Sequence, residues 1–223
     1  REANYTMLLV AGPEIAVAST KAYTAQVALQ AILAKALGEK LGNQDAKDWD
    51  LQHDLAIAAE GIQQIVDGKE KLKELADQYI VKSRNAFYIG RGIDHAVALE
   101  GALKLKEVSY IQTEGFAAAE LKHGTISLIE DGTPVIALIN DPVTADLTRG
   151  NIQEVASRGA SVITIVGKEF ANSDDTIVLP EINYYMSALL TVVPTQLLAY
   201  YASKDKGLDV DKPRNLAKSV TVE

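Results

Sequence analysis

Two short apolar runs, at 134–139 and 161–166, constrain the fold of this chain most. Nearly every residue in them is Val, Ile, Leu or Ala. Strands that are covered by helices on both faces have such continuous apolar runs, whereas strands with one wet face alternate apolar and polar residues. A helical pattern at 144–157 separates the two runs. Strands that alternate with helices predict a parallel sheet with a layer of helices on each face.

Further segments continue this alternation along the chain. Strands are expected at 5–10, 86–89 and 176–179, and helices at 22–37, 51–66, 69–79, 96–110 and 184–201. Pro194 is expected to kink the last helix, because proline lacks the backbone N–H that a helix interior uses. The predicted fold class is α/β: a doubly wound parallel sheet with a flavodoxin-like strand order.

The helix expected at 22–37 is apolar almost all round. Such a helix must be covered on several sides, and the chain has no earlier elements that would cover it. We therefore expect residues 1–44 to be the end of a preceding domain and residues 45–207 to be a complete domain with leading helices. Residues 208–223 would form a C-terminal tail. An uncovered apolar helix also predicts association, and we expect a homodimer.

Charge and composition narrow the choice of partners. A net charge of −8 argues against nucleic acid, whose binding uses basic surfaces. No apolar run approaches the roughly 20 residues of a membrane helix. The absence of cysteine excludes disulfides and fits a cytoplasmic protein. The three histidines have no metal-site spacing, so no metal and no cofactor are expected. The expected ligand is a small molecule.

The tail at 211–223 carries a lone lysine, Lys218, among small or apolar neighbours. Disordered tails are more polar and more repetitive, so the branched apolar side chains of this tail are expected to dock. A docked and desolvated amine can attack a carbonyl to form a Schiff base. The alternative is a solvated surface lysine, which is the common fate of this residue type.

Glu100, Lys104 and Glu107 fall at positions i, i+4 and i+7 of one helix, and therefore on one face. One interpretation is a solvated ladder of ion pairs, which contributes little to stability. The other is a buried carboxylate whose charge and orientation are set by the amine beside it, as a general base requires.

His123 follows Glu120, Leu121 and Lys122 and precedes Gly124. A histidine beside a glycine at the end of a helix is partly accessible and can titrate near neutral pH. A structural histidine with satisfied hydrogen bonds is an equally good interpretation. A carboxylate, a histidine and a lysine on separate segments would together suit ring opening and proton transfer on a sugar.

The loop at 90–94, Gly-Arg-Gly-Ile-Asp, follows a strand and precedes a helix, where such folds bind anions. It matches neither the dinucleotide fingerprint nor the P-loop. The loop after the next strand contains Asp141, which would repel phosphate, and Pro142, which lacks a donor. We therefore expect a tight turn here rather than a phosphate site.

Four segments resemble one known family. They are 14–22, 98–107, 120–124 and 211–223, and they occur in order along essentially the whole chain. Together they are similar to the C-terminal isomerase part of the glucosamine-6-phosphate synthases, the isomerising glutamine–fructose-6-phosphate aminotransferases. The resemblance implies a longer enzyme with a glutaminase domain and two sugar-isomerase (SIS) domains. It would make glucosamine 6-phosphate from fructose 6-phosphate and ammonia, and two subunits would share each site.

The resemblance also implies catalytic roles for the lysine, histidine and glutamate residues singled out above. Lys218 would form the Schiff base with the opened sugar, and Glu107 would carry the proton between C1 and C2. His123 of the neighbouring subunit would assist ring opening. Glu100 and Lys104 would support Glu107.

The same resemblance implies three contacts to the sugar: Val17, Ser19 and the backbone around Ala217. The family's phosphate loops lie before the first residue of this chain, and no cysteine nucleophile is present. We therefore expect the chain to be unable to turn over substrate by itself.

Two other functions were weighed. One is a non-catalytic SIS module that binds a sugar phosphate or only dimerises, which would not need the Lys218 tail. The other is a related SIS enzyme, either a fructosamine-phosphate deglycase or a phosphosugar isomerase. The tail and the three charged residues of the helix together favour the synthase.

Overall fold

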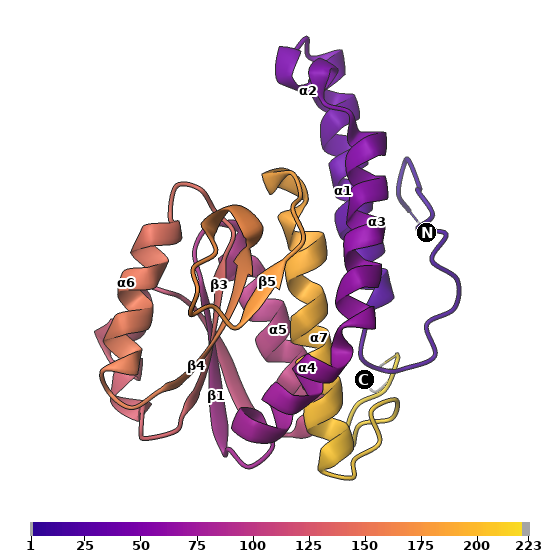
Figure 1. The fold of residues 1–223 in the computed structure, drawn as a ribbon. Coiled ribbons are helices and arrows are strands. Elements are labelled where there is room, and N and C mark those ends of the chain that lie inside the picture. The colour runs from indigo at the N-terminus through magenta and orange to yellow at the C-terminus, as the bar shows by residue number, and fades with distance from the viewer. Residues whose placement is uncertain (1, 220–223) are drawn as a thin grey trace.

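A computed structural model describes residues 2–219, which contain a five-stranded parallel sheet with the order β2-β1-β3-β4-β5 (Figure 1). The strands are β1 Asn85–Gly90, β2 Gln112–Ala117, β3 Pro134–Ile139, β4 Ser161–Gly167 and β5 Ile177–Leu179. This is the flavodoxin-like strand order. The predicted α/β class and the doubly wound parallel sheet are confirmed.

Helices cover both faces of the sheet (Figure 1). One face packs on α5 Ile93–Ser109, α7 Ser187–Asp205 and the short α4 Lys69–Leu75, and the other packs on α6 Ala145–Ala156. Neighbouring residues of β1 pack into the cores on opposite faces of the sheet, because side chains alternate along a strand. Tyr88 belongs to the core under α5 and α7, whereas Phe87 belongs to the core under α6. All six residues of β3 are buried, which explains its continuous apolar sequence.

Three N-terminal helices form a layer beside α7 (Figure 1). They are α1 Lys21–Lys40, α2 Gln44–Asp48 and α3 Leu51–Asp67. No residue of α1 is buried, and Leu37 near its end is 58% exposed. Within residues 2–219, the apolar helix is therefore uncovered over much of its surface, as its sequence predicts. None of the helices in this range has the length and apolar character needed to cross a membrane.

Several local predictions were wrong. Residues 5–10 form no strand in the described structure, since no sheet edge lies beside them to pair with. Residues 38–50 are polar and contain two glycines, a composition that predicts a linker, but they include the end of α1 and all of α2. The helix expected at 69–79 changes after α4 into a π-helical turn, Ala76–Ile80. The expected kink at Pro194 stays a prediction, since α7 is one continuous helix with Pro194 in its interior.

The strand β2 was missed altogether. It is an edge strand whose first four residues are Gln, Thr, Glu and Gly. Gln112 and Glu114 are exposed, whereas Thr113 between them is buried, so the start of this strand is covered on one face only and carries no apolar run. Single 3₁₀ turns at Glu120–His123, Thr125–Leu128, Lys168–Phe170 and Tyr184–Met186 complete the regular structure of the described residues.

The C-terminal tail lies against the domain as far as it is described, and residues 220–223 lie outside that range. Pro213 is buried. The backbone N–H of Arg214 donates to the Tyr110 hydroxyl at 2.7 Å, and the Arg214 guanidinium lies 4.1 Å from the centre of the Tyr110 ring. The N–H of Val17 donates to the Asp211 carbonyl at 2.9 Å. These contacts anchor the tail, but Pro213 is the one buried residue among the described residues 211–219, and the Lys218 side chain is 47% exposed. The expected desolvation of the Lys218 amine is therefore not seen in a single copy of residues 2–219.

Candidate functional site

The face of α5 that carries Glu100, Lys104 and Glu107 is largely enclosed. The Lys104 Nζ atom lies 2.8 Å from Glu107 Oε2 and 3.6 Å from Glu100 Oε1. The Lys104 side chain is only 6% exposed, and the Glu100 and Glu107 side chains are 14% and 22% exposed. These charges are not a solvated ladder. The arrangement is an enclosed pair of carboxylates around one ammonium.

Electrostatics of this cluster depend on its burial. Burial raises the pKa of Glu100, and the ammonium of Lys104 opposes that rise. Tyr23 of α1 also has a raised pKa, from its own burial and from the nearby charge of Glu100. The start of α1 therefore lies close to the charged face of α5.

A cavity of about 150 Å³ adjoins the cluster. Residues from four segments line it, namely the stretch before α1, α5, α7 and the tail: Ala16, Ala18, Thr20, Lys104, Val108, Gln196, Ala199, Tyr200, Val210 and Asp211. The side-chain nitrogen of Gln196 is buried and has no hydrogen-bond partner there. The lining of the cavity thus includes one amide donor without a partner among residues 2–219, from Gln196, and the side chain of Lys104, which is paired with Glu107.

Lys218 reaches the same region from the tail. Its Nζ donates to the carbonyl of Ala16 at 2.9 Å and to Glu14 Oε2 at 3.2 Å. Ala16 also lines the cavity beside Lys104. The structure therefore brings Lys218 and the charged face of α5 to one corner of the molecule. No hydrogen bond or ion pair joins Lys218 to Glu107 in the described part of the chain.

The three residues expected to contact sugar lie around Lys218. The carbonyl of Val17 is 3.5 Å from Lys218 Nζ. Ser19 Oγ donates to Glu14 Oε2 at 3.0 Å. Ala217 precedes Lys218 in the chain and is exposed.

His123 lies apart from these groups. It ends an exposed 3₁₀ turn, and its side chain has no hydrogen bond or ion pair with any other described residue. One copy of residues 2–219 therefore leaves His123 outside the corner that holds Lys218. A contribution of His123 from a neighbouring subunit stays a prediction.

The space at the loop after β1, where such folds bind anions, is filled by the side chain of Asp141. A carboxylate oxygen of Asp141 lies directly against Gly92, whose φ is +55°. The same carboxylate accepts from the Tyr184 hydroxyl at 3.0 Å and from the N–H of Val143 at 2.8 Å. A phosphate placed here would meet this negative charge, which agrees with the expected tight turn.

Asp94, the first acidic residue of α5, is 2% exposed beneath that loop. It accepts from the backbone N–H of Asn140 at 2.6 Å and from its side-chain amide at 2.8 Å. Burial raises the pKa of Asp94 to about 6, although the hydrogen bonds from Asn140 oppose the rise.

This raised pKa predicts a pH dependence of stability. The folded state holds the Asp94 proton more tightly than the unfolded chain. The contribution of Asp94 to the free energy of unfolding is therefore greatest below pH 4 and declines as the pH rises through about 6. The decline is about 3 kcal/mol. Urea unfolding between pH 4 and 7 measures the effect. As the pH rises, we expect the free energy of unfolding of Asp94→Asn to increase relative to that of the wild type by about this amount. Asp174→Asn, at an exposed site, serves as the control; a constant Asp94→Asn difference would contradict the assignment.

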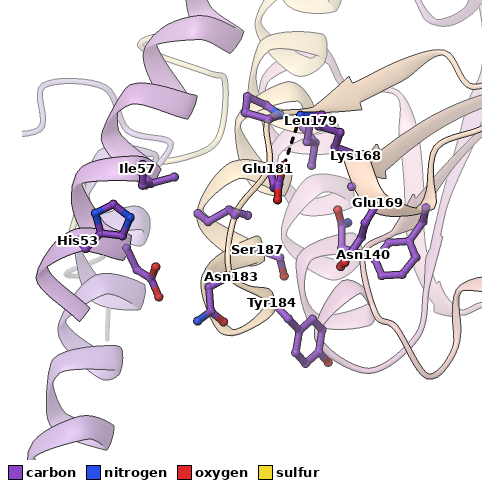
Figure 2. Close-up of a pocket in the computed structure, with 15 residues that line it drawn as sticks. His53, Ile57, Asn140, Lys168, Glu169, Leu179, Glu181, Asn183, Tyr184 and Ser187 are labelled. Atoms are coloured by element: carbon purple, nitrogen blue, oxygen red, sulfur yellow. Dashed lines mark hydrogen bonds and ion pairs between the residues drawn. The ribbon is translucent and has the colours of Figure 1, made fainter. Parts of the chain in front are cut away.

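A larger cavity, of about 470 Å³, opens at the carboxyl ends of β3, β4 and β5 (Figure 2). Asp54, Glu169 and Glu181 contribute negative charge to its lining, and its Lys168 is paired with Glu181 at 3.3 Å. The net negative charge opposes a phosphate ester. Among residues 2–219, no group of three or more acidic, histidine or cysteine side chains is arranged to hold a metal ion.

Glu14 is the functional candidate that sequence reasoning missed. It contacts Lys218, which lies 204 positions away, and no local pattern signals such a contact. Gln196 was missed for a similar reason, since its neighbours in the helix are ordinary apolar residues.

The sequence of this chain is similar to that of curated aminotransferases. Two curated relatives, the glutamine–fructose-6-phosphate aminotransferases [isomerizing] of Streptococcus pneumoniae and Lactiplantibacillus plantarum, are 63% and 62% identical over 223 residues. Each alignment covers 100% of this chain and 37% of the relative. The chain therefore spans little more than a third of the length of these relatives.

Solved structures show the same similarity. The C-terminal domain of glucosamine-fructose-6-phosphate aminotransferase from Francisella tularensis has a TM-score of 0.81 and 33% identity. That match covers 91% of this chain and 58% of the other. A glucosamine-6-phosphate deaminase from Thermotoga maritima has a TM-score of 0.71 at 23% identity, covering 93% of this chain and 59% of the other, and shares the fold.

A family model described as the SIS domain matches residues 79–203, which include the whole sheet, α5, and nearly all of α7. The match covers more than half of the chain. The chain therefore belongs to the SIS domain family.

Proposed function

We propose that this chain is the isomerase part of an enzyme that converts fructose 6-phosphate and glutamine-derived ammonia to glucosamine 6-phosphate. The observation that carries the proposal is a series of contacts: Lys218 donates to the carbonyl of Ala16, and Ala16 lines one cavity together with Lys104, the lysine between the enclosed carboxylates of α5. The names of the relatives support the choice of reaction. The substrates, like the activity of the whole protein, are part of the proposal.

The chemistry assigns one role to each group. Lys218, as the neutral amine, would attack the C2 carbonyl of the opened sugar, and loss of water would leave a protonated Schiff base. Ammonia would then displace the Lys218 amine from C2, which leaves the sugar with its own imine and frees the lysine. Glu107 would take the proton from C1 of that imine and return it to C2, acting first as base and then as acid. Lys104 would hold Glu107 in place, and Glu100 would balance the charge of Lys104.

The remaining contacts complete the proposed site. Val17, Ser19 and the backbone of Ala217 would bind the sugar, since they surround Lys218. His123 of a second subunit would assist ring opening, so we propose a homodimer. The uncovered surface of α1 supports such an association.

Domain limits and the phosphate site are also proposed. We divide the chain into the end of one SIS domain at 1–44, a second SIS domain at 45–207 and an active-site tail at 208–223. Because Asp141 fills the loop of the second domain, we expect the substrate phosphate to bind outside it. We accordingly expect the 223-residue chain to have no turnover by itself.

Trapping of the Schiff base tests the proposal. The full-length enzyme is incubated with fructose 6-phosphate, reduced with borohydride and mapped by mass spectrometry. We expect a sugar adduct on Lys218, which is lost in Lys218→Arg and retained in Lys122→Arg, because arginine keeps its charge and does not form the imine. An adduct on another lysine, or none, would overturn the assignment. A module that only binds sugar phosphate would give no adduct.

A further inference from the structure

Glu14 occupies a defined position at the start of α1. Its carboxylate accepts from the backbone N–H of Thr20 at 2.7 Å, the N–H of Ala22 at 3.4 Å and the Ser19 hydroxyl at 3.0 Å. The side chain of Thr20, the residue before the helix, makes no capping bond of its own to the helix backbone. Glu14 therefore caps α1 from six residues upstream, and these contacts fix its carboxylate independently of the tail.

The charge of Glu14 is stable over the working pH range. Burial opposes the negative charge, but hydrogen bonds from Thr20, Lys218, Ala22 and Ser19 outweigh it and lower the pKa of Glu14 to about 2. The positive end of the dipole of α1 favours an anion at the same place. The Glu14 side chain is 10% exposed, so solvent screens its charge less than that of a surface carboxylate.

Lys218 approaches this preformed anion. Glu14 Oε2 lies 3.2 Å from Lys218 Nζ, and the other acceptors at that nitrogen are the neutral carbonyls of Ala16 and Val17. A protonated Schiff base keeps the positive charge of the nitrogen but has a single N–H. Among the described residues that contact this nitrogen, Glu14 is the one that carries an opposite charge.

We propose that Glu14 is the positioning residue and counter-ion of Lys218: it holds the amine at the start of α1 and stabilises the positive nitrogen after the Schiff base forms. This inference rests on the proposed function, in which Lys218 reacts with the sugar. Glu14 acts through Lys218 and through Ser19, and takes no proton from the substrate.

The test compares two substitutions in the full-length enzyme. Glu14→Gln keeps the shape and an acceptor for the N–H of Thr20 but removes the charge, whereas Glu14→Asp keeps the charge. For Glu14→Gln we expect kcat and the yield of borohydride-trapped adduct on Lys218 to fall about 10- to 100-fold, as for loss of a charged hydrogen bond. KM for fructose 6-phosphate is expected to change less than threefold. Glu14→Asp should retain at least tenfold more activity than Glu14→Gln.

A control tests whether loss of any carboxylate from α1 has the same effect. Glu39→Gln removes a more exposed carboxylate of α1 that is paired with Lys35, and it should keep wild-type kcat and trapping. Equal trapping in wild type and Glu14→Gln, or equal activity of the Asp and Gln variants, would overturn the inference. Absence of any adduct in the wild type would instead refute the proposed function. If Glu14→Gln fails to fold, Glu14→Asp decides, because near-wild-type activity supports the charge and a 100-fold loss excludes it.

Discussion

Replacing Glu107 with glutamine in the full-length enzyme is expected to lower kcat for the isomerisation by about 10²- to 10⁴-fold, the usual contribution of a general acid–base residue. Glutamine matches the shape of glutamate but cannot accept and return a proton. KM should change little, because Lys104 and the cavity beside it remain in place. Proton exchange at C1 in deuterated water, followed by NMR, measures the step directly.

The control for this substitution is Glu114→Gln on the edge strand β2, where the side chain is exposed. We expect that variant to keep the wild-type rate. The Schiff base on Lys218 should still form in Glu107→Gln, because the two residues act in different steps. A Glu107→Gln enzyme that exchanges the C1 proton at the wild-type rate would remove Glu107 from the mechanism.

Replacing Lys104 with methionine is expected to destabilise the 223-residue chain by about 3–5 kcal/mol at neutral pH, the typical cost of breaking a buried ion pair. Methionine fills much of the same volume but leaves Glu100 and Glu107 facing one another without a cation. Two negative charges in a poorly hydrated place repel each other, and one of them must take up a proton. The destabilisation caused by Lys104→Met should therefore become smaller as the pH falls toward 5.

Urea unfolding followed by circular dichroism measures this effect. Lys106→Met provides the matched control, because Lys106 is on the same helix but exposed, and such a change normally costs less than about 0.5 kcal/mol. The double variant Lys104→Met/Glu100→Gln is expected to recover part of the loss. Equal unfolding midpoints for Lys104→Met and Lys106→Met would show that the charged face of α5 is not the buried network described above.

Local sequence was sufficient for the parts of the fold whose surroundings are uniform. The strands β3 and β4 are covered on both faces, so their buried residues are apolar apart from Thr164, and the pattern is unambiguous. The helix face with Glu100, Lys104 and Glu107 was also predictable, because the helical repeat alone places those residues together. The edge strand β2 was not predictable in this way, since one wet face and a free edge impose little on its residues.

The sequence by itself determined the α/β class and the doubly wound sheet. It also singled out the residues to which we assign the chemistry, an isolated lysine in the tail and carboxylates beside a lysine on one helix. Only the tertiary structure decided that those carboxylates are enclosed, that Asp141 fills the loop after β1, and that Glu14 holds Lys218. The physical reason is the range of the interactions. Helix and strand periodicity are local properties, whereas burial and the Glu14–Lys218 contact depend on segments about 200 residues apart that only the folded chain brings together.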